Sequence, residues 1–329
     1  MLDQSIRPPR IVQGPRLHLL QEERSAVRHL AERLVAAPPA LLDDPGWVTR
    51  ARQVSCRLPT RLTEAIRAYR HDPGPTGTLV LTGLPVGEPD LPDTPTVRDS
   101  VERIPALPAV TAMLIGLQLG EVIAYREEKI GALVQNVVPV PGLLETQSNA
   151  GSVPLELHVE NAFHPQRPDY VGLLCLRNDH AKQAGTLVAC IRQALPLLTE
   201  ADRRILHEPR FLTAPPPSFR SGDRTRPHSV LQGSLTDPNI CVDFNATRAL
   251  DEEAREVMVR LRQAITDVAA SLVLQSGSMA LVDNRLVLHG RTEFVPRFDG
   301  HDRWLHRVYV HLDNRRSRAY RDDGGAVLT

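Results

Sequence analysis

The segment LELHVENAFHP at residues 155–165 places His158 and Glu160 two positions apart. On an extended strand, residues i and i+2 point to the same face, so an imidazole and a carboxylate could share one cavity. His289, in LVDNRLVLHGRTEF, is the best third candidate, and we expect it just after a strand. Two histidines and one carboxylate form the facial triad of non-haem Fe(II) oxygenases, which leaves coordination positions open. The pattern predicts a metal site at His158, Glu160 and His289.

The same residues can also be interpreted without any role in metal binding. An isolated H-x-E arises often by chance, and the chain has 12 histidines. A surface histidine beside an acid is the common explanation of such a pair. We therefore expect the remaining candidates to be structural or surface residues: His164, His180, His207, His228, His301, His306 and His311.

Two arginines downstream of His289 favour the functional interpretation. Arg303 and Arg307 lie in DRWLHRVYVHL, where residues 303, 305 and 307 would share one face of a strand. A buried guanidinium needs an acid partner, and its planar fork binds a carboxylate through two parallel hydrogen bonds. The pair therefore predicts a cavity for carboxylate ligands. The alternative is an exposed basic strand edge that discourages aggregation.

The elements that must position these residues follow from hydropathy patterns. Apolar residues at helical spacing predict helices, and short apolar runs between turn residues predict strands. The stretches 86–108 and 213–235 are expected to be loops, and the second is a candidate lid. The expected helices are 21–36, 59–70, 109–118 and 250–274. The expected strands are 77–83, 132–140, 170–177, 186–191, 240–244, 278–284 and 304–312.

Composition narrows the class of protein. The chain of 329 residues is long enough for one large domain or at most two. Its 39 basic and 39 acidic residues balance, so nothing predicts a nucleic acid or an anionic membrane as partner. We read no apolar membrane span and no signal peptide, and four widely spaced cysteines favour reduced thiols in the cytoplasm. Many short strands with few helices predict an antiparallel sandwich or barrel with helices outside.

Three segments carry a specific resemblance to a known family. HVENAFHPQRPDYVGLLCLRND, GTLVA and VDNRLVLHGRTEFVPRFDGHDRWLHRVYV resemble the clavaminate synthase-like 2-oxoglutarate oxygenases, a TauD-like group that includes asparagine oxygenase and arginine β-hydroxylases. The resemblance implies a mainly β fold with flanking helices and a double-stranded β-helix (jelly-roll) core. It also implies a single oxygenase domain over 1–329. This would comprise a mostly helical part at 1–125, a core at 126–312 and a tail at 313–329.

The resemblance also implies roles for individual residues. His158, Glu160 and His289 would bind Fe(II), and Arg303 and Thr186 would bind the distal carboxylate of the cosubstrate 2-oxoglutarate. Without it, Thr186 is an ordinary strand residue, and Glu127, Glu128 and Asn149 belong to a charged turn and a loop. The substrate-contacting positions that it implies are Arg307, Asp243, Glu128, Glu127 and Asn149, beside Glu160.

Asp243, in ICVDFNATR, matches a family acid at the side-chain end of the substrate. Members that use arginine present two acids there, spaced i and i+2, and here the earlier position is Cys241. This departure weakens the case for a guanidinium clasp. A neutral urea or amide, or a single ammonium, stays possible: citrulline, asparagine, glutamine, lysine and ornithine, with arginine not excluded.

The leading hypothesis is thus an Fe(II)/2-oxoglutarate-dependent hydroxylase of a free L-amino acid, acting at Cβ or Cγ with O2 in specialised metabolism. Glu160 favours hydroxylation, since related halogenases lack that carboxylate. Desaturation or cyclisation at the same metal site stays open. So do a Zn-dependent jelly-roll hydrolase or isomerase, and a binding protein without activity. The oligomeric state is not predicted.

Overall fold

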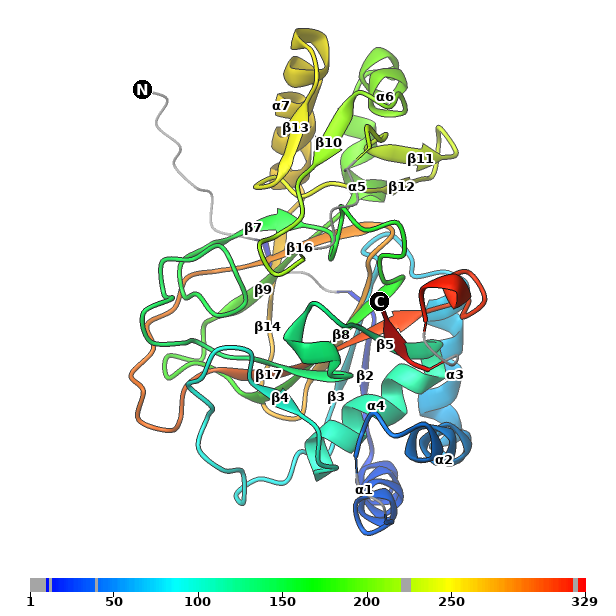
Figure 1. The fold of residues 1–329 in the computed structure, drawn as a ribbon, viewed down its shortest axis with the longest axis vertical. Helices are drawn as coiled ribbons and strands as arrows, with labels where there is room; N and C mark the ends of the chain where they lie inside the picture. Colours follow the sequence, from blue (N-terminus) through cyan, green and yellow to red (C-terminus); the bar gives the residue numbers. More distant parts are fainter. Residues whose placement is uncertain (1–9, 12–13, 39–40, 220–225, 322–324) are drawn as a thin grey trace.

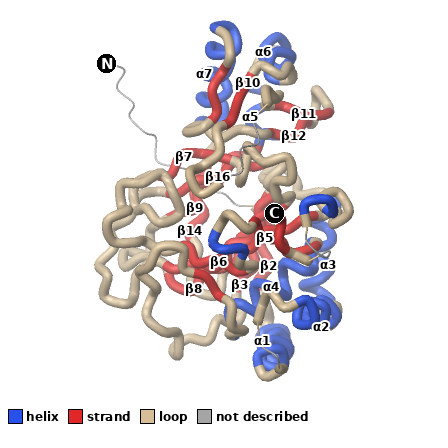
Figure 2. The backbone as a smooth tube through the Cα atoms, in the orientation of Figure 1, coloured by secondary structure: helices blue, strands red, loops and turns tan. Residues whose placement is uncertain are grey.

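The structure is a computed structural model, and it describes residues 10–11, 14–38, 41–219, 226–321 and 325–329. Two β-sheets form the centre of the molecule, and helices gather at opposite ends (Figures 1 and 2). The first group consists of α1 (Gln21–Val35), α2 (Pro45–Ser55), α3 (Thr60–His71) and α4 (Leu107–Leu119). The second consists of α5 (Ile191–Ala194), α6 (Glu200–Leu206) and α7 (Glu252–Asp267).

The larger sheet has nine strands and the smaller has five. The larger follows the order β18-β5-β17-β8-β15-β3-β2, with β6 pairing β17 and β4 pairing β6. The smaller follows the order β1-β14-β9-β16-β7. The larger sheet's strands are β2 (Arg16–His18), β3 (Thr78–Thr82), β4 (Val101–Glu102), β5 (Glu121–Tyr125), β6 (Val134–Val137), β8 (Tyr170–Arg177), β15 (Met279–Asp283), β17 (Trp304–His311) and β18 (Val327–Leu328). The smaller sheet's strands are β1 (Arg10–Ile11), β7 (Leu155–His158), β9 (Gly185–Cys190), β14 (Ala270–Val273) and β16 (Val287–Arg291).

The larger sheet buries both of its faces. Along β8, Leu174 and Leu176 belong to a core shared with α1–α4, whereas Leu173 and Cys175 belong to a second core shared with β9, β16 and α7. The alternation of strand side chains explains how one apolar run serves two cores. Helix α4 is apolar on all sides and lies buried between the sheet and the other N-terminal helices.

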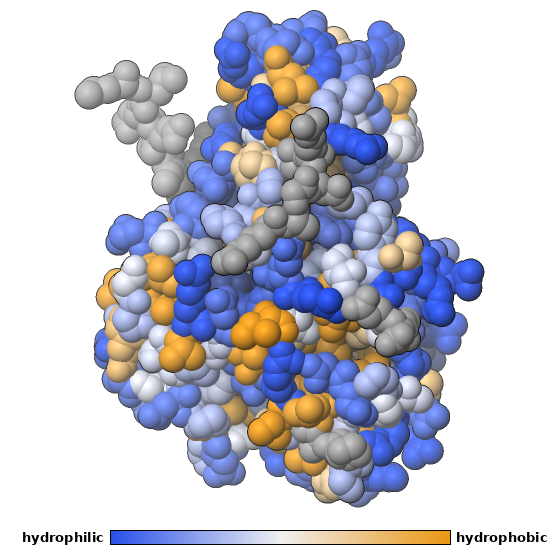
Figure 3. All heavy atoms as spheres, viewed as in Figure 1, coloured by the Kyte–Doolittle hydropathy of each residue, from blue (hydrophilic) through white to orange (hydrophobic). Residues whose placement is uncertain are grey.

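A small lobe stands beside the smaller sheet. Two hairpin-like pairs, β10 (Phe211–Thr213) with β13 (Thr247–Ala249) and β11 (Leu231–Gly233) with β12 (Pro238–Ile240), accompany α5–α7 (Figure 1). Figure 3 shows that the face in view is mainly hydrophilic, with hydrophobic residues in separate groups. Among the described residues, no helix combines the length and apolarity that a membrane span requires.

Most expected elements are present, but several expectations were wrong. The loop expected over 86–108 contains β4 and the start of α4. The helix expected over 250–274 ends at Asp267, and β14 then pairs with β9. The apolar residues after the helix form β14 because they pair with β9 on one side and with β1 on the other. The strand expected over 240–244 is also wrong, because β12 already ends at Ile240. Beyond it, only an isolated bridge forms, at Asp243.

The loop expected at 213–235 contains β11 and the end of β10. Part of it, 220–225, lies outside the described residues, so its closure as a lid stays a prediction. The division at residues 125 and 312 also stays a prediction. The part before 125 supplies strands β2–β5 to the larger sheet, and the segment after 312 supplies β18, which pairs with β5.

Candidate active site

A cavity of about 990 Å³ opens between the two sheets and the small lobe. All ten residues singled out from the sequence for metal, cosubstrate or substrate contacts line it. They come from strands of both sheets, the turn after β5, the loop before β7 and the segment after β12. The ten are Glu127, Glu128, Asn149, His158, Glu160, Thr186, Asp243, His289, Arg303 and Arg307.

Strand pairing brings the two histidines together. His289 lies inside β16, not after a strand as expected, and it faces His158 of β7 directly in the antiparallel register. Their ring centroids are 4.5 Å apart. Glu160 follows the end of β7, and its backbone N–H donates to Asn284 Oδ1 (2.7 Å), which fixes the turn. One ligand atom from each of His158, Glu160 and His289 lies within 4.8 Å of the others.

The protonation states of these side chains suit a divalent cation. His158 Nδ1 donates to the carbonyl of Glu156 (2.8 Å), which orients the ring and leaves Nε2 as its candidate ligand atom. Burial lowers the pKa of His289 and keeps it neutral. Burial, the largest influence, would raise the pKa of Glu160, but Arg307 and the neighbouring histidines together hold that pKa below its ordinary range. Two neutral imidazoles and one carboxylate fit Fe(II).

Arg307 is neutralised by acids of the protein itself. Its guanidinium donates to Glu160 Oε1 (2.9 Å), to Glu128 Oε1 and to Gln135 Oε1 (3.0 Å from Nε). Tyr309 also donates to Glu128 Oε1 (2.9 Å). The sequence argument that two buried arginines must await two ligand carboxylates is therefore wrong for this one.

Arg303 has no such acid. It is 4% exposed, and no hydrogen bond or ion pair joins its guanidinium to another described residue; the ring of Phe294 lies 5.8 Å away. Burial lowers its pKa. Arg291 lies over the same ring at 5.4 Å and donates to the carbonyls of Ser148 (3.4 Å) and Val153 (3.1 Å). Burial and the charge of Arg303 lower the pKa of Arg291 to about 9. This end of the cavity carries excess positive charge.

Thr186 adds a hydroxyl to that end. It is buried in β9 and stands directly opposite Arg291 of β16 in the register. Two positions further along the same strand pair, His289 stands opposite Val188. Side chains at i and i+2 share a face, so the cationic end and the candidate metal ligands occupy neighbouring rows of one sheet.

Asp243 lies in a turn beside His158, to which an isolated β-bridge joins it. Its Oδ1 accepts the backbone N–H groups of Asn245 (2.8 Å) and Ala246 (3.2 Å). Cys241 is absent from the cavity lining, and its thiol donates to the carbonyl of Ala162 (3.2 Å). Asp243 is thus the cavity acid of this turn.

Sequence reasoning missed several residues of the site. Asn161 donates to Glu128 Oε2 (3.3 Å), and its φ of 52° is a conformation that asparagine tolerates. The position could have been noted one residue after Glu160, but nothing in the spacing marks it. Lys129 is buried and donates to the carbonyl of Asn136 (3.3 Å). Burial and the charge of Arg307 lower its pKa to about 8. Arg291 and Gln135 were also missed.

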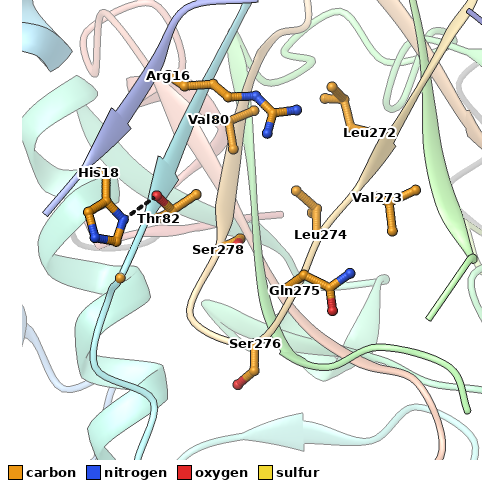
Figure 4. A pocket seen from close by; sticks show the side chains of 11 residues that line it. Arg16, His18, Val80, Thr82, Leu272, Val273, Leu274, Gln275, Ser276 and Ser278 are labelled. Carbon is orange, nitrogen blue, oxygen red and sulfur yellow. Dashed lines mark hydrogen bonds between the residues drawn. The ribbon is translucent and has the colours of Figure 1, made fainter. Parts of the chain in front are cut away.

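Two other places have features of a site, but each lacks part of this combination. His180, Asp299 and Asp302 bring ligand atoms together, yet Asp302 already accepts the N–H groups of Arg297 and Phe298. A second cavity, of about 370 Å³, lies between β2, β3 and β14 (Figure 4). There His18 is hydrogen-bonded to Thr82 (3.0 Å).

Comparisons with known proteins point to the same kind of chemistry as the residues that line the cavity. The family model described as taurine catabolism dioxygenase TauD, TfdA family, matches residues 114–309. The chain is 46% identical over 309 residues to L-asparagine oxygenase of Streptomyces coelicolor, covering 94% of this chain and 93% of that protein. It is 35% identical over 295 residues to clavaminate synthase 2 of Streptomyces clavuligerus, covering 88% and 90%.

Solved structures match over nearly the whole chain. One is asparagine oxygenase in complex with Fe(II), 2S,3S-3-hydroxyasparagine and succinate, with a TM-score of 0.92 and 45% identity. The match covers 95% of this chain and 98% of that one. Another is the non-heme iron oxygenase OrfP in complex with Fe and alpha-ketoglutaric acid, with a TM-score of 0.88 and 31% identity. It covers 96% of this chain and 100% of that one.

Proposed function

The chain belongs to the TauD/TfdA family of Fe(II)/2-oxoglutarate-dependent dioxygenases, and from this premise we propose that it hydroxylates free L-asparagine at Cβ. The hydrolase, isomerase and inactive alternatives fall away with this membership. The substrate proposal is supported by the 46% identity to an L-asparagine oxygenase and by Asp243, which lines the cavity from a turn whose Cys241 does not. The observation that carries the activity is a metal-ligating triad beside a buried arginine without an acid partner among the described residues.

His158, Glu160 and His289 hold the iron in this proposal. With 2-oxoglutarate and O2, the bound metal supplies the oxidation that inserts one oxygen atom into a C–H bond and releases succinate and CO2. The chain positions that chemistry. The carbonyl of Glu156 sets the tautomer of His158, and Arg307 keeps Glu160 ionised.

Arg303 and Thr186 hold the distal carboxylate of 2-oxoglutarate. A guanidinium that is 4% exposed and lacks an acid partner among the described residues is a strong receptor for an anion, because binding removes the cost of burying its charge. Thr186 offers a hydroxyl on the same side of the metal ligands.

The α-amino and α-carboxylate groups of the amino acid meet the opposite charges around Arg307. Arg307 binds the carboxylate, and Glu128, oriented by Asn161 and Tyr309, binds the ammonium. Asn149 and Glu127 line the cavity nearby and complete the contacts. When the amino acid binds, the ion pair between Arg307 and Glu128 is replaced by two ion pairs with the ligand. The buried charges therefore stay balanced.

We also propose the sheet architecture, the cellular location and the reaction type of the enzyme. The two facing sheets form a double-stranded β-helix, and the enzyme acts in the cytoplasm in specialised metabolism without nucleic acid or membrane partners. Glu160 favours hydroxylation over halogenation, because a halogenase needs that coordination position for chloride.

A panel of free amino acids tests the function. With Fe(II), 2-oxoglutarate and O2, we expect succinate formation to rise when L-asparagine is added. We also expect the mass of the asparagine to increase by one oxygen atom. The panel includes citrulline, glutamine, arginine, lysine and ornithine. A stronger response to one of these would replace asparagine as the substrate, and no response to any of them would remove the proposed amino-acid hydroxylase activity.

A further inference from the structure

One wall of the cavity is formed by the end of β10 with residues 214–217 and by the turn 243–247. The two segments lie side by side, because Thr213 pairs with Thr247 and the N–H of Ala214 donates to the carbonyl of Ala246. The residues that line the cavity from them are Thr213, Ala214, Pro215–Pro217, Asp243, Asn245 and Ala246. The turn bridges to the metal ligand His158. In the proposed function this wall meets the side chain of the amino acid, and its hydrogen-bonding groups decide which side chains fit.

The hydroxyl groups of this wall form a chain that leads away from the cavity. The backbone N–H of Asp243 donates to Thr247 Oγ1 (2.9 Å). Thr247 Oγ1 lies 2.8 Å from Thr213 Oγ1, which lies 2.8 Å from Nε2 of His228. His228 Nδ1 lies 3.0 Å from the carbonyl of Ser229.

The direction of this chain follows from its last partner. A carbonyl only accepts, so His228 Nδ1 carries the proton. Burial lowers the pKa of His228, as does the charge of Arg167, and the neutral ring leaves Nε2 as an acceptor. Thr213 therefore donates to His228, and Thr247 donates to Thr213. Both hydroxyl protons are used, and Thr213 keeps a lone pair.

The backbone donors of the wall are used as well. Pro215, Pro216 and Pro217 have no N–H, and the N–H of Ala214 donates to the carbonyl of Ala246 (3.1 Å). The N–H groups of Asn245 and Ala246 both donate to Asp243 Oδ1. Asp243 Oδ2 has no hydrogen bond to another described residue. The wall presents acceptors to the cavity from its backbone and hydroxyl groups.

We propose that this acceptor wall selects amino acids whose side chain ends in a hydrogen-bond donor, such as a carboxamide, and rejects those that end in a carboxylate, and that Thr213 and His228 add to the selectivity that Asp243 provides. Thr213 contacts the side chain of the substrate. His228 is a positioning residue, because it acts by holding the proton of Thr213 away from the cavity. The inference rests on the proposed function and names the property of the substrate that the site reads.

Isosteric pairs of amino acids test the proposal directly. Asparagine with aspartate, and glutamine with glutamate, differ only in the terminal group, which is a neutral donor in the amide and a charged acceptor in the acid. In the wild-type holoenzyme we expect kcat/KM for the better amide to exceed that of its acid by at least about 100-fold, because a second carboxylate beside Asp243 would be repelled. Comparable turnover of an acid and its amide would overturn the inference. No response to any amino acid would instead overturn the proposed function.

Variants at Thr213 and His228 locate the selectivity. Thr213→Val removes the acceptor and should raise KM for the amide roughly 3- to 10-fold, the usual effect of one hydrogen bond. Thr213→Ser keeps the hydroxyl, so its KM for the amide should stay near that of the wild type. His228→Phe keeps a planar ring but frees the proton of Thr213. It should lower the ratio of amide to acid kcat/KM by a similar factor while leaving KM for 2-oxoglutarate unchanged.

A double variant separates positioning from general damage. If His228 acts through Thr213, then His228→Phe should add nothing in the Thr213→Val background. Thr266→Val, which removes a hydroxyl that donates to the carbonyl of Arg262 on α7, is the matched control. Additive effects of the two variants, or an equal change in selectivity in Thr266→Val, would overturn the assignment.

Discussion

The two ends of the cavity each bury a guanidinium, but only one of them provides it with acid partners. Arg303 and Arg307 lie four residues apart at the start of one strand, and both are nearly inaccessible to solvent. Arg307 has two carboxylates and an amide as partners, whereas Arg303 has an aromatic ring and the like charge of Arg291 nearby. An uncompensated buried charge is costly, so the Arg303 end is built to receive an anion. The Arg307 end is built to receive both signs of charge, as an amino acid carries.

Removing the metal ligands between the two ends should have the largest effect. We expect His158→Ala and His289→Ala to abolish succinate production and Fe(II) retention on equilibrium dialysis while the circular dichroism spectrum stays native. The matched control is His180→Ala in the second cluster of possible ligands, which should keep turnover. Near wild-type turnover of either first variant would exclude that residue from the triad.

The next test removes the uncompensated cation. Arg303→Met keeps apolar volume but leaves the ligand carboxylate without its partner, which costs roughly 2–5 kcal/mol, or tens- to thousands-fold in binding. KM for 2-oxoglutarate should rise steeply, with a smaller change for the amino acid. The variant should also unfold at a higher temperature in the absence of ligands, because an uncompensated buried charge has gone. An unchanged KM for 2-oxoglutarate would assign the cosubstrate to another cation, with Arg291 and Arg307 as the candidates.

The compensated end should respond in the opposite manner. Glu128→Gln keeps the shape of the side chain and removes its charge, so the ammonium of the amino acid loses an ion pair that is mostly buried. We expect KM for the amino acid to rise about 10- to 100-fold, from a loss of roughly 1–3 kcal/mol, with little change for 2-oxoglutarate. Equal effects on both constants would show that the ends are not independent.

The sequence predicted the members of the site better than their partners. His158, Glu160 and His289 could be found because strand periodicity and family spacing are local properties of the chain. The partners of Arg307 could not be found in this way, since Gln135 and Glu128 are brought to it by a sheet register that joins residues more than 170 positions apart. The end of the helix at Asp267 was missed for the same reason, because pairing with β9 overrides a local apolar pattern.

The contrast extends along β17 to His311, whose role we expect to be in stability. This imidazole is fully buried, and Nε2 donates to the carbonyls of Gln166 (3.1 Å) and Arg167 (3.2 Å). Burial, with the charge of Arg316, lowers its pKa to about 4. Arg303 and Arg307 stay charged for ligands, whereas His311 is held neutral.

The pH dependence of unfolding tests this difference and should show the smallest effect. The folded pKa lies below the value of about 6.5 expected in the unfolded chain, so the unfolded state binds the extra proton. The contribution is therefore complete above pH 6.5 and is lost as the pH falls towards 4. Between pH 7.5 and 5.5 the wild type should lose about 1 kcal/mol more unfolding free energy in urea than His311→Gln, whose amide can still donate to a carbonyl. Equal losses in the two proteins would mean that folding does not change proton binding at His311, and that burial does not lower its pKa.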